Sequence, residues 1–124
     1  MANWQVMHDP DLDARGLIRF VQVESQKWRT HSFPPEDRTV ELQALGVCEE
    51  AGELAHAVLK RRQGIRGTEA EHIGEIRDAV GDIIIYLCGL CSSIGLDVET
   101  CLKIAWVEVA QRDWSEHKET GVAS

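Results

Sequence analysis

Two short acidic stretches, each set inside an apolar run, place the strongest constraint on how this chain can fold. The first is Glu-Glu-Ala-Gly-Glu at residues 49–53. The second covers residues 75–82 and leads directly into Ile-Ile-Ile-Tyr-Leu. Burying a carboxylate costs free energy unless it is paired, hydrogen-bonded or bound to a cation. A fold that buries the flanking apolar residues must therefore supply a partner for these acids.

Length and charge exclude several classes of protein. The 124 residues predict one domain, residues 1–124, with a single modest core. A net charge of −8 argues against a general nucleic-acid-binding protein, which normally has a basic face. No secretory signal is visible, and the longest apolar stretch, residues 83–90, is too short to span a bilayer. We therefore expect a cytoplasmic protein with reduced cysteines and no membrane partner.

Hydrophobic spacing, capping residues and helix breakers predict four helices with short connections. Thr68 and Asp97 are predicted N-caps, Gly64 is a predicted helix end, and the prolines at 34 and 35 make residues 30–37 a connector. The isoleucine run could also form a strand, but its flanks are helical and no second strand is available to pair with it. The predicted helices cover residues 11–29, from between 36 and 39 to 62, 69–94, and 98–113. The ends of the chain, residues 1–10 and 115–124, are predicted to be loosely ordered.

Four helices with short connections predict an all-α, antiparallel four-helix bundle. Each glycine inside a helix costs about 1 kcal/mol relative to alanine, and close helix–helix approach is the expected compensation. The glycines concerned are Gly46, Gly52, Gly74 and Gly81. The last helix is expected to bury Leu102, Ile104, Ala105, Trp106 and Val109.

Helical geometry places the acids of each stretch on one helix face. At 100° per residue, the glutamates of residues 49–53 fall within about 100° of one another, and Glu75, Asp78 and Asp82 within about 60°. Packed helices lie about 8–10 Å apart, so carboxylates from both helices can meet between them. An oxygen-rich site of this kind suits Mg²⁺ or Mn²⁺ better than zinc.

The acidic pattern resembles a known family. A Glu-Glu-x-x-Glu motif occupies residues 49–53. After a spacer, an acidic pair ends at Asp82, just before an Ile/Val-rich run. This pattern is similar to the motif of the MazG-like, all-α nucleoside triphosphate pyrophosphohydrolases. This superfamily includes the dimeric dUTPases, the dCTP pyrophosphatases and phosphoribosyl-ATP pyrophosphatase. The resemblance covers about residues 17–114. The chain departs from the motif at Ala79, where the family usually has Glu. The second-helix ligand is then Asp78 or Glu75, and we favour Asp78 because it lies one turn from Asp82.

The resemblance implies a MazG-like bundle, completed by oligomerisation as a homodimer or homotetramer. It implies hydrolysis of a (d)NTP substrate to (d)NMP and pyrophosphate, with Mg²⁺ as cofactor and Mn²⁺ as a substitute. Glu49 or Glu50 would orient or deprotonate the attacking water. The metal ligands would be Glu50, Glu53, Asp78 and Asp82. The residues expected to contact substrate are Trp28, His31, Lys60 and Arg61.

Two other functions stay open on the sequence alone. A non-catalytic helical interaction module could carry the acids as solvated or ion-paired side chains. A ferritin-like di-iron carboxylate protein requires Glu-x-x-His on two helices. Glu53-x-x-His56 supplies one such pair, and the next helix offers no equivalent. We interpret Cys88-x-x-Cys91 as buried small side chains rather than half of a zinc site.

Overall fold

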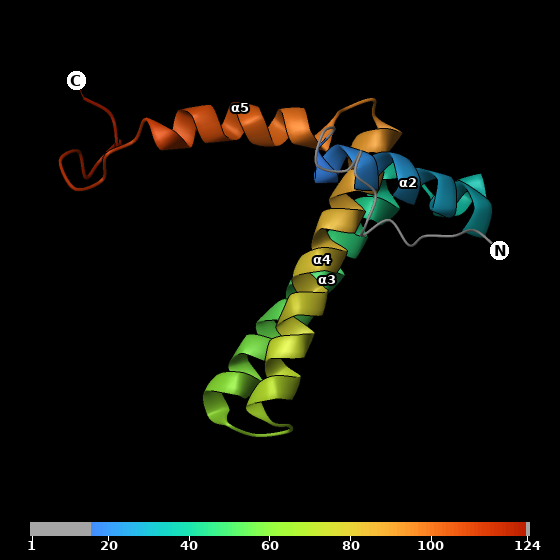
Figure 1. Ribbon diagram of the computed structural model, residues 1–124, viewed down its shortest axis with the longest axis horizontal. Coiled ribbons are helices and arrows are strands. Elements are labelled where there is room, and N and C mark those ends of the chain that lie inside the picture. Colours follow the sequence, from blue (N-terminus) through green and yellow to red (C-terminus); the bar gives the residue numbers. More distant parts are fainter. Residues whose placement is uncertain (1–15, 124) are drawn as a thin grey trace.

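The computed structural model describes residues 16–123, which form four α-helices and one short 3-10 helix (Figure 1). No strand occurs in this range, so the prediction of an all-α chain is confirmed, and the isoleucine run lies within a helix. In chain order the elements are α2 (Leu17–Ser32), η1 (Pro35–Asp37), α3 (Val40–Gln63), α4 (Glu69–Ser93) and α5 (Val98–Ala110).

The predicted capping residues determine several helix ends. The Thr68 side chain accepts a hydrogen bond from the backbone N–H three residues later, 3.2 Å away, at the start of α4. Asp97 caps α5 in the same way, at 3.0 Å. Gly64 ends α3 in the left-handed conformation, with φ of 68°, which glycine adopts without steric cost. The two predicted N-caps and the predicted helix end are confirmed.

The first helix continues further than predicted. It runs to Ser32 instead of ending at Arg29, because a proline restricts the residue immediately before it and not the whole preceding turn. Phe33, which precedes Pro34, is accordingly extended. The connector is shorter than expected and contains η1. The predicted start of this helix, at residues 11–15, and the predicted loose segment at residues 1–10 lie outside the described residues.

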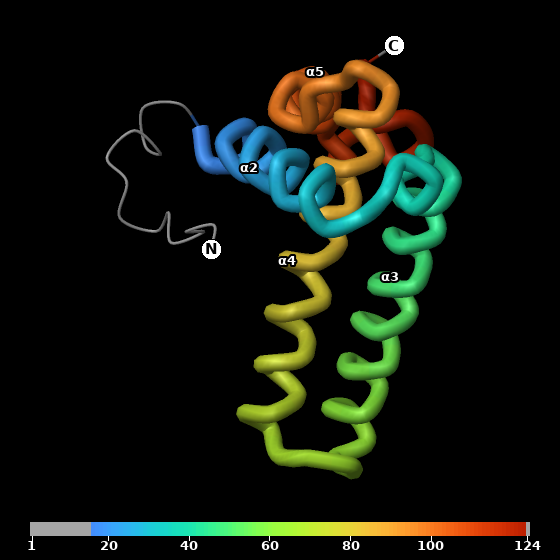
Figure 2. Tube along the Cα trace, turned by 90° about the vertical axis from the view of Figure 1, so that its right-hand side faces the viewer, coloured from blue at the N-terminus to red at the C-terminus, as the bar shows by residue number. Residues whose placement is uncertain are grey.

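A long antiparallel hairpin of α3 and α4, closed by the turn at residues 64–68, forms the body of the molecule (Figures 1 and 2). Helix α2 crosses the end of the hairpin that lies away from this turn. Helix α4 contacts α2, α3 and α5. The other half of the hairpin extends away from α2 and α5.

Buried side chains are few and small. Among the described residues, the buried hydrophobic side chains are those of Ala57, Ala79, Cys88 and Cys91. Both cysteines are free thiols, in agreement with their interpretation as small core residues. The buried polar residues are Gln22, Arg29, Gln43 and His72. A single copy of the chain therefore has a much smaller apolar core than its length allows.

Gln22 fixes the first part of α2 to the connection between α4 and α5. Its Nε2 donates to the Leu96 carbonyl, at 2.9 Å, and to Ser92 Oγ, at 3.2 Å. Its Oε1 accepts from the Val98 backbone N–H, at 2.9 Å. The buried Gln22 amide thus forms hydrogen bonds with three residues, Ser92, Leu96 and Val98.

Arg29 fixes the second part of α2. Its guanidinium donates to the Ile85 carbonyl, at 3.2 Å, and to Gln26 Oε1, at 2.9 Å. Gly89 makes room for it, because a Cβ added at Gly89 would lie 2.6 Å from Arg29 Cζ. Desolvation lowers the pKa of Arg29 from its usual value. The seam between α2 and α4 is therefore built on polar side chains that have partners.

The prediction that α5 buries one apolar face is wrong for a single copy of the chain. Helix α5 has no buried residue, and both Ile104 and Trp106 are 63% exposed. The chain bends by 107° between α4 and α5, so α5 projects away from the hairpin, and no other helix of residues 16–123 runs alongside it (Figure 1). Its attachment includes two ion pairs at its first turn, from Arg19 to Asp97 (2.9 Å) and to Glu99 (3.1 Å). Helix α5 also ends at Ala110, three residues earlier than predicted.

Within residues 16–123, no single helix is long and apolar enough to cross a bilayer, although the bent pair of α4 and α5 would satisfy the criterion together.

Close packing explains only one of the four helix glycines. A Cβ added at Gly46 would overlap the Tyr86 ring, whereas Cβ atoms added at Gly52, Gly74 or Gly81 would meet no atom within 4 Å. The prediction of close helix–helix approach is therefore wrong at Gly52, Gly74 and Gly81 for a single copy of the chain. Gly52 and Gly81 lie on surfaces that α3 and α4 do not turn toward each other.

The C-terminal residues are more ordered than predicted. They form successive turns, in which the Asp113 N–H donates to the Gly121 carbonyl at 2.7 Å. The Asp113 carboxylate accepts from the backbone N–H groups of Ser115, at 2.9 Å, and Glu116, at 3.2 Å. The Ser115 hydroxyl also donates to this carboxylate, and its hydrogen bond, followed by the backbone bonds, lowers the pKa of Asp113.

Candidate functional site

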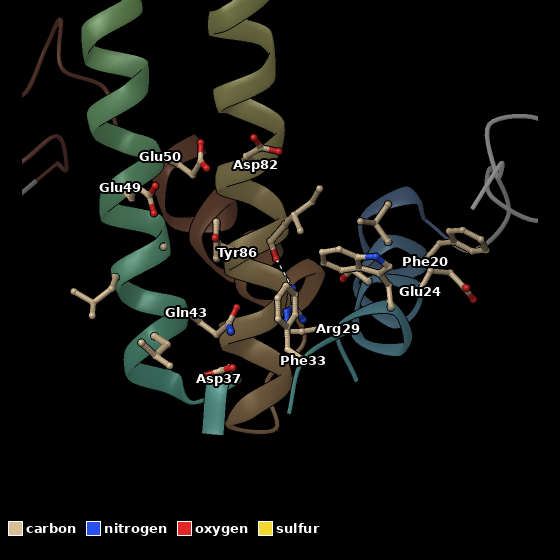
Figure 3. A pocket seen from close by; sticks show the side chains of 17 residues that line it. Phe20, Glu24, Arg29, Phe33, Asp37, Gln43, Glu49, Glu50, Asp82 and Tyr86 are labelled. Atoms are coloured by element: carbon tan, nitrogen blue, oxygen red, sulfur yellow. Dashed lines mark hydrogen bonds between the residues drawn. The ribbon is translucent and has the colours of Figure 1, made fainter. Parts of the chain in front are cut away.

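A pocket of about 880 Å³ lies between α2, α3 and α4 (Figure 3). Pockets of this volume are typical of small-molecule sites. Its lining combines the aromatic side chains Phe20, Trp28 and Phe33 with carboxylates of α3 and α4. Trp28 and Phe33 meet edge to face, with ring centroids 5.7 Å apart and planes at 85°. The pocket therefore offers aromatic surface and negative charge to one ligand.

The acidic wall is formed by Glu49 and Glu50 of α3 and by Asp82 of α4 (Figure 3). One carboxylate oxygen of Glu50, Oε2, is fully enclosed and has no hydrogen-bond partner. Desolvation, followed by the charge of neighbouring carboxylates, raises the pKa of both Glu50 and Asp82. No lysine or arginine among the described residues forms an ion pair with any of these three acids. The wall thus carries negative charge that no ion pair within residues 16–123 offsets.

The predicted metal ligands are divided between two neighbouring pockets. Glu50 and Asp82 line the large pocket. Glu53 and Asp78 line a second pocket of about 270 Å³ between α3 and α4. The charge of Glu53 still raises the pKa of Glu50 and Asp82, so the two groups of acids are close enough to interact. Within residues 16–123, no three His, Cys, Asp or Glu side chains already converge to hold a metal ion.

Ala79, the departure from the family motif, is buried and lines the second pocket. Glu75 and Asp78, the two alternatives for the second-helix ligand, line this same second pocket. Neither of them lines the large pocket beside Asp82. The acidic wall of the large pocket therefore consists of two residues from α3 and one from α4.

The four residues predicted to contact substrate do not lie together in one pocket. Trp28 lines the large pocket. His31 is exposed near the end of α2 and lines neither pocket. Lys60 lines the second pocket and donates to Gln63 Oε1 at 3.0 Å. Arg61 pairs with Glu69 at 2.8 Å, near the hairpin turn, and lines neither pocket.

Sequence reasoning missed several polar residues that line the large pocket, among them Arg29, Gln43 and Tyr86. Gln43 lies seven residues before Glu50, and Tyr86 lies four residues after Asp82, so helical spacing places each beside a predicted site residue. That spacing could have identified them. Gln43 Oε1 is buried without a hydrogen-bond partner, so it is free to accept one from a ligand. Nothing in the spacing of apolar residues indicates that Arg29 is buried.

Comparison of the chain with protein-family models, with curated protein sequences and with solved structures finds no match in any of the three. The motif residues and the geometry of the pocket are the observations that bear on function.

Proposed function

We propose that this chain hydrolyses nucleoside triphosphates to nucleoside monophosphates and pyrophosphate, with Mg²⁺ as cofactor and Mn²⁺ as a substitute. The observation that carries the proposal is the composition of the large pocket, which joins aromatic side chains to a carboxylate wall without an ion-paired cation. A nucleotide has the matching composition, with a flat base at one end and a metal-bound polyphosphate at the other. The resemblance to MazG-like enzymes supports the same reaction.

The aromatic part of the pocket supplies contacts for a base. Trp28 and Phe20 offer apolar ring surface, which is suited to stacking or edge contacts with a heterocycle. Gln43 Oε1 can accept a hydrogen bond from an amino or imino group of the base. Leaving a buried acceptor without a partner costs about 1–3 kcal/mol, so a ligand that donates to it recovers this free energy.

The acidic wall supplies the contacts for the cation. The enclosed, unpartnered oxygen of Glu50 and the raised pKa of Asp82 indicate charge that a hard dication would stabilise. Glu50 and Asp82 would hold the ion, with Glu53 and Asp78 drawn in from the second pocket. Mg²⁺ bound there would neutralise the polyphosphate and lower the pKa of a water. Glu49, which is exposed on the same wall, would orient that water and accept its proton.

The same proposal includes a second copy of the chain as the partner that covers α5. The apolar side chains of α5 are exposed in the single chain, and the buried hydrophobic side chains among the described residues are alanines and cysteines. Large apolar patches on a monomer mark interaction sites. Pairing α5 with another copy would supply the missing core and would close the bundle as a homodimer or homotetramer.

The test is pyrophosphate release from a panel of canonical and modified (d)NTPs with Mg²⁺. We expect release from at least one substrate, and we expect Glu50→Gln to reduce it about 100-fold or more, because Glu50 would both hold the cation and face the substrate. Glu41→Gln removes an exposed carboxylate from the same helix outside both pockets and should leave the rate unchanged. Undiminished release by Glu50→Gln would reject the site, and release of orthophosphate alone would reject the reaction.

A helical interaction module is the second candidate, because an unpartnered α5 is also what a docking helix would present. The two candidates differ in their response to metal and nucleotide. If the folded wild-type chain releases no pyrophosphate with any substrate and shows no metal-dependent rise in melting temperature, the interaction module is favoured.

A further inference from the structure

The second pocket lies between α3 and α4. The residues that line it belong to the half of the hairpin next to the turn, and this half extends away from α2 and α5 (Figures 1 and 2). Residues of both helices and of the turn line it. These residues are Glu53, His56, Lys60, Arg66, His72, Glu75, Asp78 and Ala79. The small side chain of Ala79, which is 3% exposed, leaves the space between the helices open. The proposed nucleotide chemistry does not require this pocket to bind any ligand of its own.

His72 is the unusual residue of this pocket. It is 2% exposed, and neither ring nitrogen has a hydrogen-bond partner. The carboxylate of Glu75 lies 3.8 Å from Nδ1, which is beyond hydrogen-bond distance. Most buried polar side chains in proteins have at least one partner. His72 lines the pocket, and a neutral imidazole in this position has an unused nitrogen lone pair, which is the group that transition metals bind.

The two helices bring similar donors to this pocket in opposite chain order. Helix α3 carries Glu53-x-x-His56, and helix α4 carries His72-x-x-Glu75. Because α3 and α4 are antiparallel, the reversed order on α4 places both histidines and both glutamates along the lining of one pocket. Within residues 16–123 these side chains do not yet converge on one ion position. In the sequence alone, helix α4 offers no Glu-x-x-His in the order found on α3, because its pair has the reverse order.

We propose that His56, His72 and Glu75 bind a transition-metal dication of the zinc class in this pocket. Two imidazoles and a carboxylate suit Zn²⁺ or Co²⁺, whereas Mg²⁺ prefers oxygen ligands alone. Hence the site is chemically distinct from the carboxylate wall of the large pocket. His56 and Glu75 are exposed, so their side chains can rotate toward the buried His72 when the ion binds.

The charges around the pocket favour a cation. Three carboxylates line it, against two cationic side chains, Lys60 and Arg66. With neutral imidazoles the balance is negative, which disfavours an anionic ligand. The bound metal would join α3 to α4 beside the hairpin turn, where neither α2 nor α5 supports the hairpin.

The experiment titrates the metal-stripped full chain with Co²⁺ and follows the visible absorption of the ion. We expect one Co²⁺ per chain, displaced by equimolar Zn²⁺ and not by equimolar Mg²⁺. His72→Gln and His56→Gln should each weaken Co²⁺ binding about tenfold or more. His31→Gln is the matched control, because His31 is exposed and lines neither pocket. His56 is also exposed, so His56→Gln tests the site even if His72→Gln fails to fold.

The outcomes separate this site from the proposed enzyme. Glu50→Gln should lose pyrophosphate release and keep the Co²⁺ spectrum, whereas His56→Gln should lose the Co²⁺ spectrum. Unchanged Co²⁺ affinity in His56→Gln, displacement of Co²⁺ by equimolar Mg²⁺, or binding of inorganic phosphate in place of Co²⁺ would overturn the proposal.

Discussion

Helices α2 and α5 both attach to the end of the α3–α4 hairpin that lies away from its turn, but they are attached in opposite ways. Helix α2 buries polar side chains, Gln22 and Arg29, whose donors have partners on α4 and the connection that follows it. Helix α5 exposes apolar side chains such as Trp106 and is tied by ion pairs at its first turn. Hydrogen bonds within the chain specify the position of α2. The face of α5 requires another surface to cover it.

The largest effect on stability is expected at the polar seam. Arg29→Ala removes two hydrogen bonds, leaves the Ile85 carbonyl without its side-chain donor and opens a cavity, so it should cost about 3 kcal/mol of unfolding free energy. Urea unfolding followed by circular dichroism measures this change. Lys27→Ala on the same helix removes only an exposed pair with Glu24 and should cost less than about 0.5 kcal/mol. Equal unfolding midpoints for the two variants would mean that polar bonds do not hold α2.

The role of the exposed α5 face is tested by measuring self-association of the chain instead of its unfolding. Trp106→Ala should weaken self-association by about 2 kcal/mol, or about 30-fold in the dissociation constant, as expected for an aromatic anchor of an interface. Sedimentation over a range of concentrations measures it. Lys103→Ala, an exposed change on the same helix, should have little effect. A wild-type chain that stays monomeric at every concentration would contradict the assignment of a second copy to α5.

Two glycines of α3 distinguish packed surface from free surface. Gly46→Ala forces a methyl group against the Tyr86 ring and should cost about 1–2 kcal/mol of unfolding free energy. Gly52→Ala meets open space and should stabilise the chain by up to about 1 kcal/mol, because alanine favours the helix. Urea unfolding at low protein concentration compares them. A destabilising Gly52→Ala would show that a second copy covers this face of α3 as well.

The smallest expected effect is a pH dependence at the acidic wall, where Glu50, unlike Arg29, has an oxygen with no partner. The pKa of Glu50 is raised in the folded state, so the folded protein binds this proton more tightly than the unfolded chain does. The stability that this proton provides is fully present below the unfolded-state pKa of about 4.3 and is lost as the pH rises through the folded-state pKa. Without metal, Glu50→Gln should therefore raise the urea midpoint at pH 7 and leave it nearly unchanged at pH 4.

Glu41→Gln serves as the control for this pH comparison, because Glu41 is an exposed carboxylate on the same helix. The difference in urea unfolding midpoint between Glu50→Gln and wild type should grow from pH 4 to pH 7. The difference in urea unfolding midpoint between Glu41→Gln and wild type should stay constant over the same range. Parallel pH profiles for wild type and Glu50→Gln would contradict the assignment of uncompensated charge to Glu50.

The sequence predicted those features that depend on neighbouring residues. Thr68 caps a helix and Gly64 ends one because the groups they satisfy lie within a single turn. Glu50 and Asp82 were expected to meet, and they line one pocket, because their positions follow from helical period and from the pairing of consecutive helices. Arg29 was not expected to be buried, because its partner carbonyl lies 56 residues away and no local pattern marks it.

Other errors arose where the answer depends on surfaces outside the local helix. The apolar spacing of α5 correctly describes a face that is suited to burial, but spacing does not say which surface buries it. The choice between Glu75 and Asp78 assumed that one of them joins Asp82, whereas both line the second pocket with Ala79. A reversed His-x-x-Glu order becomes meaningful only when the two helices are known to be antiparallel.

The short turn at residues 64–68 also has a consequence for the order of folding. Contacts within the α3–α4 hairpin can form outward from this turn at small sequence separation, whereas Gln22 must find Ser92, 70 residues away. Local contacts form faster because less chain must be ordered to close them. We expect the hairpin to assemble before α2 docks, so that substitutions in the α2 seam mainly accelerate unfolding and leave the refolding rate nearly unchanged.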